Sequence, residues 1–153
     1  MPRIDVIRDA GLAQVRAFYE QVGYGGGVSA ADTVLAALAG ERVLGAVRLC
    51  EEHGVIVLRG MVVAPDCLRQ GIGRALLARC VPWLDRGEAF CLPYDHLTGF
   101  YNEAGFEPVT RDAVPPFLRA RLAGYLANGQ RVLAMRRPAP GYMPNKSLAS
   151  RMA

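Results

Sequence analysis

A strand-to-helix connection in the middle of the chain limits the fold more than any other feature. Residues 63–77 read Val-Ala-Pro-Asp-Cys-Leu-Arg-Gln-Gly-Ile-Gly-Arg-Ala-Leu-Leu. A β-rich run passes through a proline into a turn, and Gly71 and Gly73 fall in the first turn of a helix. Backbone N–H groups at a helix N-terminus lack partners and carry a partial positive charge. The segment therefore predicts a phosphate or pyrophosphate site, with Arg69 and Arg74 as flanking cations.

Two common nucleotide-binding motifs do not fit this segment. The dinucleotide fingerprint needs a third glycine at position 76, which is Leu76. The P-loop needs a Gly-Lys pair, whereas the only lysine of the chain is Lys146. A nucleotide-binding regulator is therefore disfavoured. A structural alternative stays open, in which the glycines merely let a helix lie close to a sheet.

Hydrophobic spacing predicts the elements on either side of this connection. Before it, we expect a strand at 3–7, a helix at 12–22, a glycine-rich loop at 23–27 and an antiparallel meander of strands at 33–39, 42–50 and 55–63. After it, we expect a helix at 72–84 bent or ended near Pro82, a strand at 90–92, a short helix at 97–104, a strand at 106–109, a helix from 115 to 127 and a strand at 131–135. This order predicts one α+β domain at 1–137, with a mainly antiparallel sheet flanked by helices. The tail at 138–153 has no periodicity, so we expect it to be irregular or flexible.

Composition excludes several classes of protein. With 153 residues, of which 52% are hydrophobic and 21% charged, the chain can bury a core and fold as one domain. Its net charge of +4 comes from scattered arginines rather than a basic stripe, so we expect no nucleic-acid partner. No apolar run approaches the roughly 18 residues of a membrane span. The first nine residues mix charges where a signal peptide would be apolar, so we expect no membrane partner and a cytoplasmic location.

The cysteines and histidines do not form a metal-binding pattern. The chain has four cysteines, no C-x-x-C pair among them, and two histidines. We therefore expect no metal, and four unpaired buried thiols that suit a reducing compartment.

The connection at 63–77 resembles the coenzyme A loop of the GNAT superfamily of N-acetyltransferases. Residues 100–106, Phe-Tyr-Asn-Glu-Ala-Gly-Phe, are similar to a second motif of that family, an aromatic-tyrosine pair followed by a glycine-phenylalanine strand start. The order of the expected elements over 1–137 is also similar. The resemblance implies the GNAT-type acyl-CoA N-acyltransferase fold, with acetyl-CoA as the acyl donor.

The resemblance also implies roles for particular residues. The backbone of Met61, Val62 and Val63 would pair with the pantetheine arm as an added strand, and an N–H there would face the thioester carbonyl. Tyr101 matches the tyrosine that protonates the departing thiolate. The loop that would hold the pyrophosphate comprises Leu68, Arg69, Gln70, Gly71, Ile72, Gly73 and Arg74.

Two positions depart from the family pattern. The loop begins with Leu68, where arginine or glutamine is usual, so backbone amides rather than side chains would bind the pyrophosphate. A glutamate that often acts as base near the start of the fourth strand is replaced by Arg59-Gly60. Candidates for the base are Glu52, Asp95, His96 and Glu103, and a water relay is an equal alternative.

Two arginines suggest the chemistry of the acceptor. A two-residue turn at 53–54 sets Arg48 directly across from Arg59 on one face of the sheet, whereas a three-residue turn would place them on opposite faces. Opposed like charges are destabilising, so a shared face predicts a carboxylate between them, from a substrate or from an acid such as Glu51. Two solvated arginines are the alternative. His96 is a further candidate for binding the substrate. The alternative is that His96 lies at the start of a helix and is hydrogen-bonded to nearby backbone.

Together these features predict an N-acetyltransferase that moves the acetyl group of acetyl-CoA onto a primary amine of a small molecule by direct attack. An amino-acid-like acceptor with a carboxylate follows from the arginine pair, while peptides, aminoglycosides and polyamines stay open. The alternative is a non-catalytic CoA-binding module or sensor of the same fold, motivated by Leu68 and the missing glutamate. Whether the chain forms a homodimer is also open.

Overall fold

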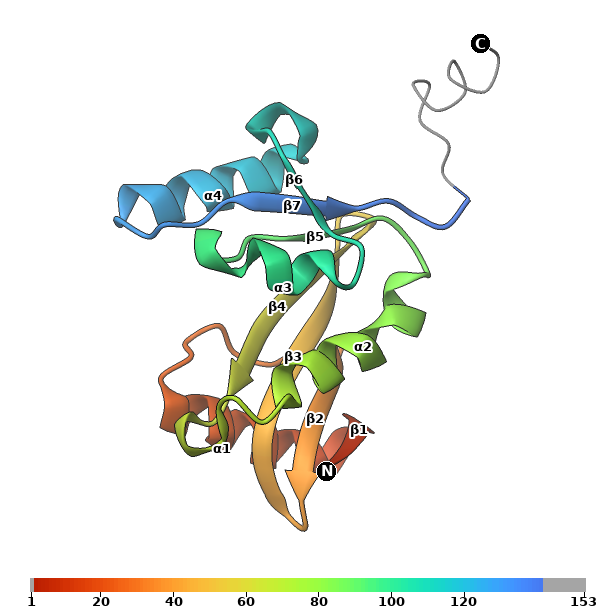
Figure 1. Ribbon diagram of the computed structural model, residues 1–153, viewed down its shortest axis with the longest axis vertical. Helices are drawn as coiled ribbons and strands as arrows, with labels where there is room; N and C mark the ends of the chain where they lie inside the picture. Colours follow the sequence, from red (N-terminus) through yellow and green to blue (C-terminus); the bar gives the residue numbers. More distant parts are fainter. Residues whose placement is uncertain (1, 142–153) are drawn as a thin grey trace.

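The computed structural model describes residues 2–141 (Figure 1). The strands are β1 (Arg3–Ile7), β2 (Thr33–Ala39), β3 (Arg42–Glu52), β4 (Val55–Val63), β5 (Ala89–Cys91), β6 (Glu107–Val109) and β7 (Ala134–Arg137). The α-helices are α1 (Leu12–Val22), α2 (Ile72–Leu84), α3 (Thr98–Asn102) and α4 (Pro116–Ala127). Single 3₁₀ turns lie at Asp9–Gly11, Pro65–Cys67, Asp95–Leu97 and Arg111–Ala113.

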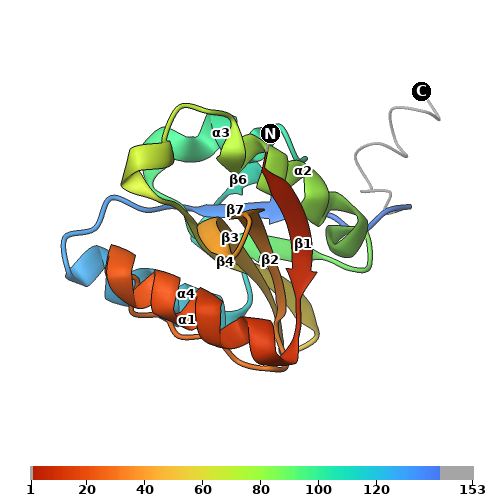
Figure 2. The same cartoon turned by 90° about the horizontal axis from the view of Figure 1, so that it is seen from below.

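The described strands form one seven-stranded sheet in the order β1-β2-β3-β4-β5-β7-β6. The pair β4 and β5 is parallel, and the other neighbouring pairs are antiparallel. Helices α1 and α4 cover one face of the sheet, and α2 and α3 cover the other (Figure 2). The predicted mixed α+β class with a mainly antiparallel sheet is therefore confirmed.

The helices form where apolar side chains recur at helical spacing. In α1, Leu12, Val15 and Phe18 are buried, and the helix ends at Gly23, whose φ of 80° suits glycine. Helix α2 buries Ile72, Leu76, Cys80 and Leu84 at a spacing of four residues. Pro82 lies inside α2, and the helix ends two residues after it, at Leu84. A proline has no backbone N–H to donate, and so few residues follow it that little of the helix is affected. Helix α4 buries Leu118 and Leu122 against Val57 of β4 and Phe90 of β5.

A bulge in β4 shapes the centre of the molecule. Between Ala46 and Arg48 of β3 the partner in β4 changes from Val62 to Arg59, so β4 contains one extra residue. Gly60 lies in this bulge with a φ of 64°, and a Cβ there would come within 2.9 Å of the Tyr19 hydroxyl. Only glycine fits both the backbone and the neighbour.

Strands β4 and β5 separate after a short contact. Their pairing covers Ile56 with Ala89 and Val57 with Phe90. Beyond these positions β4 continues to Val63 while β5 turns away from it (Figure 1). The sheet therefore contains a fork whose two arms are β4 and the end of β5.

The final strand differs from the prediction. It was expected at 131–135, but β7 spans Ala134–Arg137, where β5 and β6 pair with it on its two sides. Val132 forms only an isolated bridge with Tyr94 and packs against the cluster under α4. The residues at 142–153 of the predicted tail lie outside the described residues. Within 2–141, no helix combines the length and the apolar character that a membrane crossing requires.

Candidate active site

The fork between β4 and β5 opens into a cleft of about 520 Å³. Within the described residues, the edge of β4 that faces β5 has no strand partner beyond Val57. The cleft is lined by residues 24–26 of the glycine-rich loop, 57–62 of β4, 91–94 after β5, Leu97, Tyr101, Arg121, Tyr125, Gln130 and Val132. An unpaired strand edge in a cleft can accept an extended ligand as an additional strand.

The structure brings the predicted donor residues to this fork. Met61 and Val62 line the cleft together with Tyr101. The position of a Cβ on Gly73 would lie 3.7 Å from the Val63 side chain and 3.5 Å from the ring of Phe100. The N-terminus of α2 therefore adjoins the open end of β4 and the residue that precedes Tyr101.

The loop before α2 has a backbone suited to bind an anion. Arg69 has a φ of 65° and Gly71 a φ of 79°, so two residues close to the helix start lie in the left-handed region. Alternation of backbone conformations of this kind points N–H groups into a concave site for an anion. The strained conformation of Arg69 is a feature that proteins keep mainly where it serves a site.

Packing within the protein does not explain the glycine at position 73. A Cβ on Gly73 would make only ordinary contacts with Phe100 and Val63, and one on Gly71 would have nothing within 4 Å. Gly71 is required by its backbone conformation. Neither packing nor backbone conformation therefore requires glycine at position 73, which disfavours the purely structural reading of this turn.

The loop side chains point mostly to solvent. Leu68, where the family pattern has a polar residue, is 57% exposed. Arg69 and Gln70 are also exposed, and Arg74 forms an exposed ion pair of 2.5 Å with Glu103 of the turn after α3. Backbone amides are therefore the ordered donors of this loop.

Tyr101 combines burial with access to the cleft. It lines the cleft, is 5% exposed and is held by edge-to-face contacts with the rings of Phe100 and Phe106. Burial raises the pKa of its phenol, and nearby Cys91 and Cys80 contribute in the same direction. The hydroxyl is therefore protonated at neutral pH and is able to donate a proton.

The three carboxylates named as candidate bases are all engaged elsewhere. The residues that line the cleft include none of them. Glu52 accepts two hydrogen bonds from Arg121, and this interaction lowers the pKa of its carboxyl despite partial burial. The other two ion pairs are Asp95 with Arg131 and Glu103 with Arg74. None of the three carboxylates therefore lies where it could accept a proton from an amine in the cleft.

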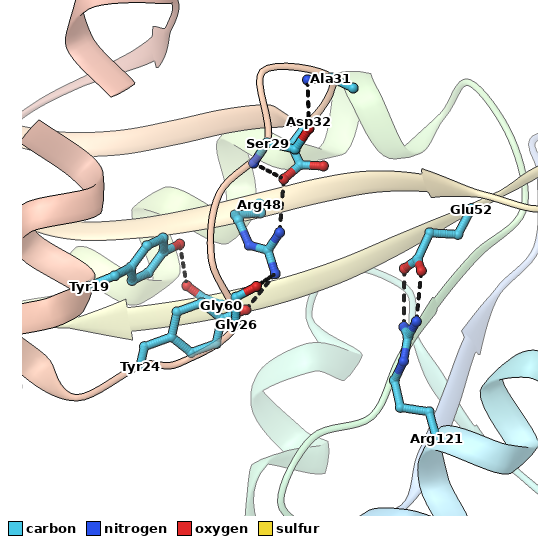
Figure 3. Close-up of polar contacts among 10 residues, drawn as sticks. All are labelled: Tyr19, Tyr24, Gly26, Ser29, Ala31, Asp32, Arg48, Glu52, Gly60 and Arg121. Carbon is cyan, nitrogen blue, oxygen red and sulfur yellow. Dashed lines mark hydrogen bonds and ion pairs between the residues drawn. The ribbon is translucent and has the colours of Figure 1, made fainter. Parts of the chain in front are cut away.

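Of the two registers that the sequence leaves open for Arg48 and Arg59, the structure has the one that places them on the same face of the sheet. The turn at 53–54 pairs Glu52 with Val55, and Arg48 lies directly across from Arg59. Arg48 is 4% exposed and donates to Asp32 at 2.8 Å and to the Tyr24 hydroxyl at 2.6 Å (Figure 3). The acid that compensates Arg48 is thus Asp32 of the preceding loop, not Glu51.

The remaining substrate candidates differ in position. Arg59 is half-buried and lines the cleft. His96 is exposed, stacks on Tyr94 at 5.9 Å between ring centroids and borders a separate hollow with Asp95 and Arg131. The structure therefore brings Arg59 to the fork and leaves His96 outside it.

Several residues of the cleft were not found from the sequence. Tyr24 of the glycine-rich loop and Asp32, which follows that loop, both accept hydrogen bonds from Arg48 and so tie the segment before β2 to β3. Arg121 of α4 meets Glu52 of β3 across 69 positions of sequence. The glycine run signals the loop, but no local pattern signals the contact between Arg121 and Glu52.

The cysteines lie in the core. All four are unpaired and buried, as predicted. Burial raises the pKa of the Cys50 and Cys80 thiols to about 12, and it also raises the pKa of Cys91, which lines the cleft. In the described part of the chain, no three His, Cys, Asp or Glu residues are grouped as metal ligands.

Solved structures share this fold. The ribosomal-protein-S18-alanine N-acetyltransferase of Escherichia coli is 16% identical, with a TM-score of 0.65 over 95% of this chain and 98% of that one. Rv2747 of Mycobacterium tuberculosis, solved with CoA, is 16% identical, with a TM-score of 0.68 over 90% and 99%. N-acetylglutamate synthase of Neisseria gonorrhoeae, solved with CoA and N-acetyl-glutamate, is 18% identical with a TM-score of 0.64, and the match covers 90% of this chain but 35% of the synthase. At these identities the likeness establishes the GNAT fold.

Sequence comparison gives the family. No curated protein matches the sequence significantly. A family model described as an acetyltransferase (GNAT) domain matches residues 30–108, which include the meander and both motifs noted above, at 63–77 and 100–106. This match covers more than half of the chain and agrees with the fold. The chain belongs to the GNAT family of acetyltransferases.

Proposed function

We propose that this acetyltransferase moves the acetyl group of acetyl-CoA onto the primary amine of a small molecule in the cytoplasm. One observation carries the proposal. The fork places the unpaired edge of β4, the protonated phenol of Tyr101 and the bare N-terminus of α2 next to one another.

The fork suits acetyl-CoA because each part of the molecule finds a matching surface. The pantetheine arm carries amide groups that can pair with the backbone of Met61, Val62 and Val63 as an added strand. The pyrophosphate suits the N–H groups of residues 68–74 at the start of α2, where Gly73 leaves the backbone uncovered. These contacts rely on backbone groups, so the departure at Leu68 does not remove them.

The reaction is a direct transfer. The amine nitrogen forms a bond to the thioester carbon, and a backbone N–H on the edge of β4 stabilises the negative charge on the carbonyl oxygen. The carbon–sulfur bond then breaks, the sulfur leaves with the electron pair, and Tyr101 donates a proton to it. Burial raises the pKa of the phenol, so Tyr101 is protonated when the thiolate leaves.

The nitrogen must lose its proton by another route, because the candidate carboxylates do not line the cleft and are paired with arginines. We assign this proton to water in the open part of the cleft. Tyr101 regains its own proton from solvent after the thiol departs. The overall change is one thioester and one amine converted to one thiol and one amide.

Acetyl-CoA binding and thiol release test the proposal. A ligand that binds only the native state stabilises it by about 2.7 kcal/mol at a hundredfold excess over Kd. We therefore expect CoA and acetyl-CoA to raise Tm, with ATP and nicotinamide dinucleotides doing less. A thiol-release screen against amines should then detect turnover. An unchanged Tm and no binding heat would refute the proposal, whereas binding without turnover of any amine would favour a CoA-binding sensor.

A further inference from the structure

Among the described residues, the charged side chains that line the cleft are all basic. Of the described residues that line it, two are arginines, Arg59 and Arg121, and none is aspartate or glutamate. The guanidinium of Arg121 is occupied, since both of its terminal nitrogens donate to Glu52, at 2.7 Å and 3.1 Å (Figure 3). Arg48, on the strand beside Arg59, is likewise occupied by Asp32.

Arg59 is the cation that these pairs leave uncompensated. Within residues 2–141 it makes no hydrogen bond and no ion pair of its own, although it is half-buried beside two other arginines. Its charge reaches Glu52, where it helps to lower the carboxyl pKa, but both oxygens of Glu52 are already bound by Arg121. Three arginines therefore share two carboxylates, and the excess positive charge lies at the wall of the cleft.

We propose that Arg59 binds the carboxylate of the acceptor, so that the acceptor is an α-amino acid or a similarly short amine bearing a carboxylate. A guanidinium matches a carboxylate through two parallel hydrogen bonds, and half-burial strengthens them. This inference rests on the proposed function, which places the thioester carbonyl against the backbone of Met61–Val63.

The position of Arg59 limits the length of the acceptor. Arg59 and Met61 are two residues apart on β4, so no more than roughly 7 Å separates their Cα atoms. This short spacing suits an acceptor that carries its amine a few bonds from the carboxylate held at Arg59. Polyamines carry no carboxylate for Arg59 to bind.

The remaining lining predicts an uncharged side chain on the acceptor. Besides the two arginines, the lining of the cleft contains several aliphatic and tyrosine side chains, including Val57, Leu92, Tyr24 and Tyr125. A basic side chain would find no acid among the described lining residues. Apolar or aromatic amino acids fit this surface best.

The experiment compares a carboxylate with its amide in two assays. In the first, N-acetyl-L-leucine and N-acetyl-L-leucinamide, which cannot react as acceptors, are titrated into the protein saturated with CoA. We expect the carboxylate to bind at least tenfold more tightly, and Arg59→Met to remove this preference. In the second, kcat/KM is measured for L-leucine and L-leucinamide, and the ratio should fall at least tenfold in Arg59→Met. Comparing ratios between variants cancels the different basicity of the two amines.

Matched variants separate the local contact from net charge. Arg16→Met removes one charge from the exposed surface of α1, outside the cleft, and should retain the preference. Arg59→Lys should restore part of it, because the charge returns without the bidentate geometry. Equal binding of carboxylate and amide by the unmodified protein would overturn the inference, as would an Arg59→Met variant that keeps the preference. Failure of the proposed function would appear separately, as absent turnover of every amine, while the binding assay still judges Arg59.

Discussion

The two sides of the fork are built by different means. The donor side, which we define as residues 61–63, 68–74 and Tyr101, relies on backbone groups, glycine and one buried phenol. The acceptor side, defined as the loop at 23–32 with Arg48, Arg59 and Arg121, relies on ion pairs between segments that are far apart in sequence. Residues 30–108, which match the family model, contain the whole donor side but neither Tyr24 nor α4.

This difference separates what a common reaction needs from what a particular substrate needs. A strand edge and a helix N-terminus can bind the same donor with many sequences, because backbone groups supply the contacts. Recognition of an acceptor depends on charged side chains and their partners, which a few substitutions can change. We therefore expect substitutions on the donor side to affect all acceptors alike, and those on the acceptor side to affect stability and selectivity.

The largest effect should come from the donor side. Tyr101→Phe removes the proton donor but keeps the ring that packs on Phe100 and Phe106. Turnover should fall by roughly 10² to 10⁴ for every acceptor, while CoA affinity measured by calorimetry stays nearly constant. A Tyr101→Phe variant with full turnover would show that Tyr101 is not the proton donor. Catalysis by the donor side would then depend on its backbone groups alone.

On the acceptor side, Arg48→Met should mainly affect stability. The side chains of Arg48 and Asp32 are 4% and 10% exposed, so the substitution leaves a buried carboxylate unpaired. Removing one partner of a buried ion pair costs about 3–5 kcal/mol. Urea denaturation should detect this loss of unfolding free energy.

Two further variants serve as controls for Arg48→Met. Arg42 forms an ion pair with Asp66 on the surface, so Arg42→Met should leave the unfolding free energy nearly unchanged. The double variant Arg48→Met with Asp32→Asn should recover part of the loss, because it removes the unpaired charge. Equal effects of Arg48→Met and Arg42→Met on the unfolding free energy would mean that the ion pair of Arg48 with Asp32 does not stabilise the acceptor side.

Gly73→Ala tests whether the donor loop is shaped for a ligand. The added methyl group makes only ordinary contacts within the protein, and alanine favours a helix over glycine by about 1 kcal/mol. Stability should therefore stay constant or increase, while CoA affinity falls more than tenfold because the methyl covers the backbone. Gly124→Ala in α4, where a Cβ would have nothing within 4 Å, is the control that should leave CoA affinity unchanged. Lost stability with unchanged CoA affinity in Gly73→Ala would favour a purely structural role.

The smallest effect concerns the contact between α4 and β3. Arg121 lowers the pKa of Glu52 below the value near 4.5 expected in the unfolded chain. The contribution of the ion pair to stability is therefore complete above that value and is lost as the pH falls through the lower folded pKa. Glu52→Gln should destabilise the protein on the order of 1 kcal/mol at neutral pH, with a difference that shrinks in acid. Denaturation curves from pH 7 to pH 3 measure it, and a constant difference would exclude the ionised carboxylate as the cause.

The sequence by itself determined most elements and the family. Alternation and helical spacing located β1 to β4 and the start of α2, because the apolar face of each element must be buried whatever surrounds it. The glycines at 71 and 73 and the tyrosine at 101 could be proposed as site residues from the sequence, because each lies in a short motif that resembles one of the family. For Arg48 and Arg59 the sequence left two turn lengths open, and the structure has the two-residue turn that sets these residues opposite each other.

Only the tertiary structure decided the rest. The bulge at Gly60 and the fork depend on how β4 meets β3, β5 and the tyrosine of α1, and a glycine within a strand does not reveal these neighbours. The last strand begins and ends later than predicted, because its bounds depend on pairing with β5 and β6. The assignment of Asp32 to Arg48 and of Glu52 to Arg121, which leaves Arg59 for a substrate, joins segments from both ends of the chain. The partners of charged and polar side chains depend on distances in space. These distances are fixed only when the helices have packed on the sheet.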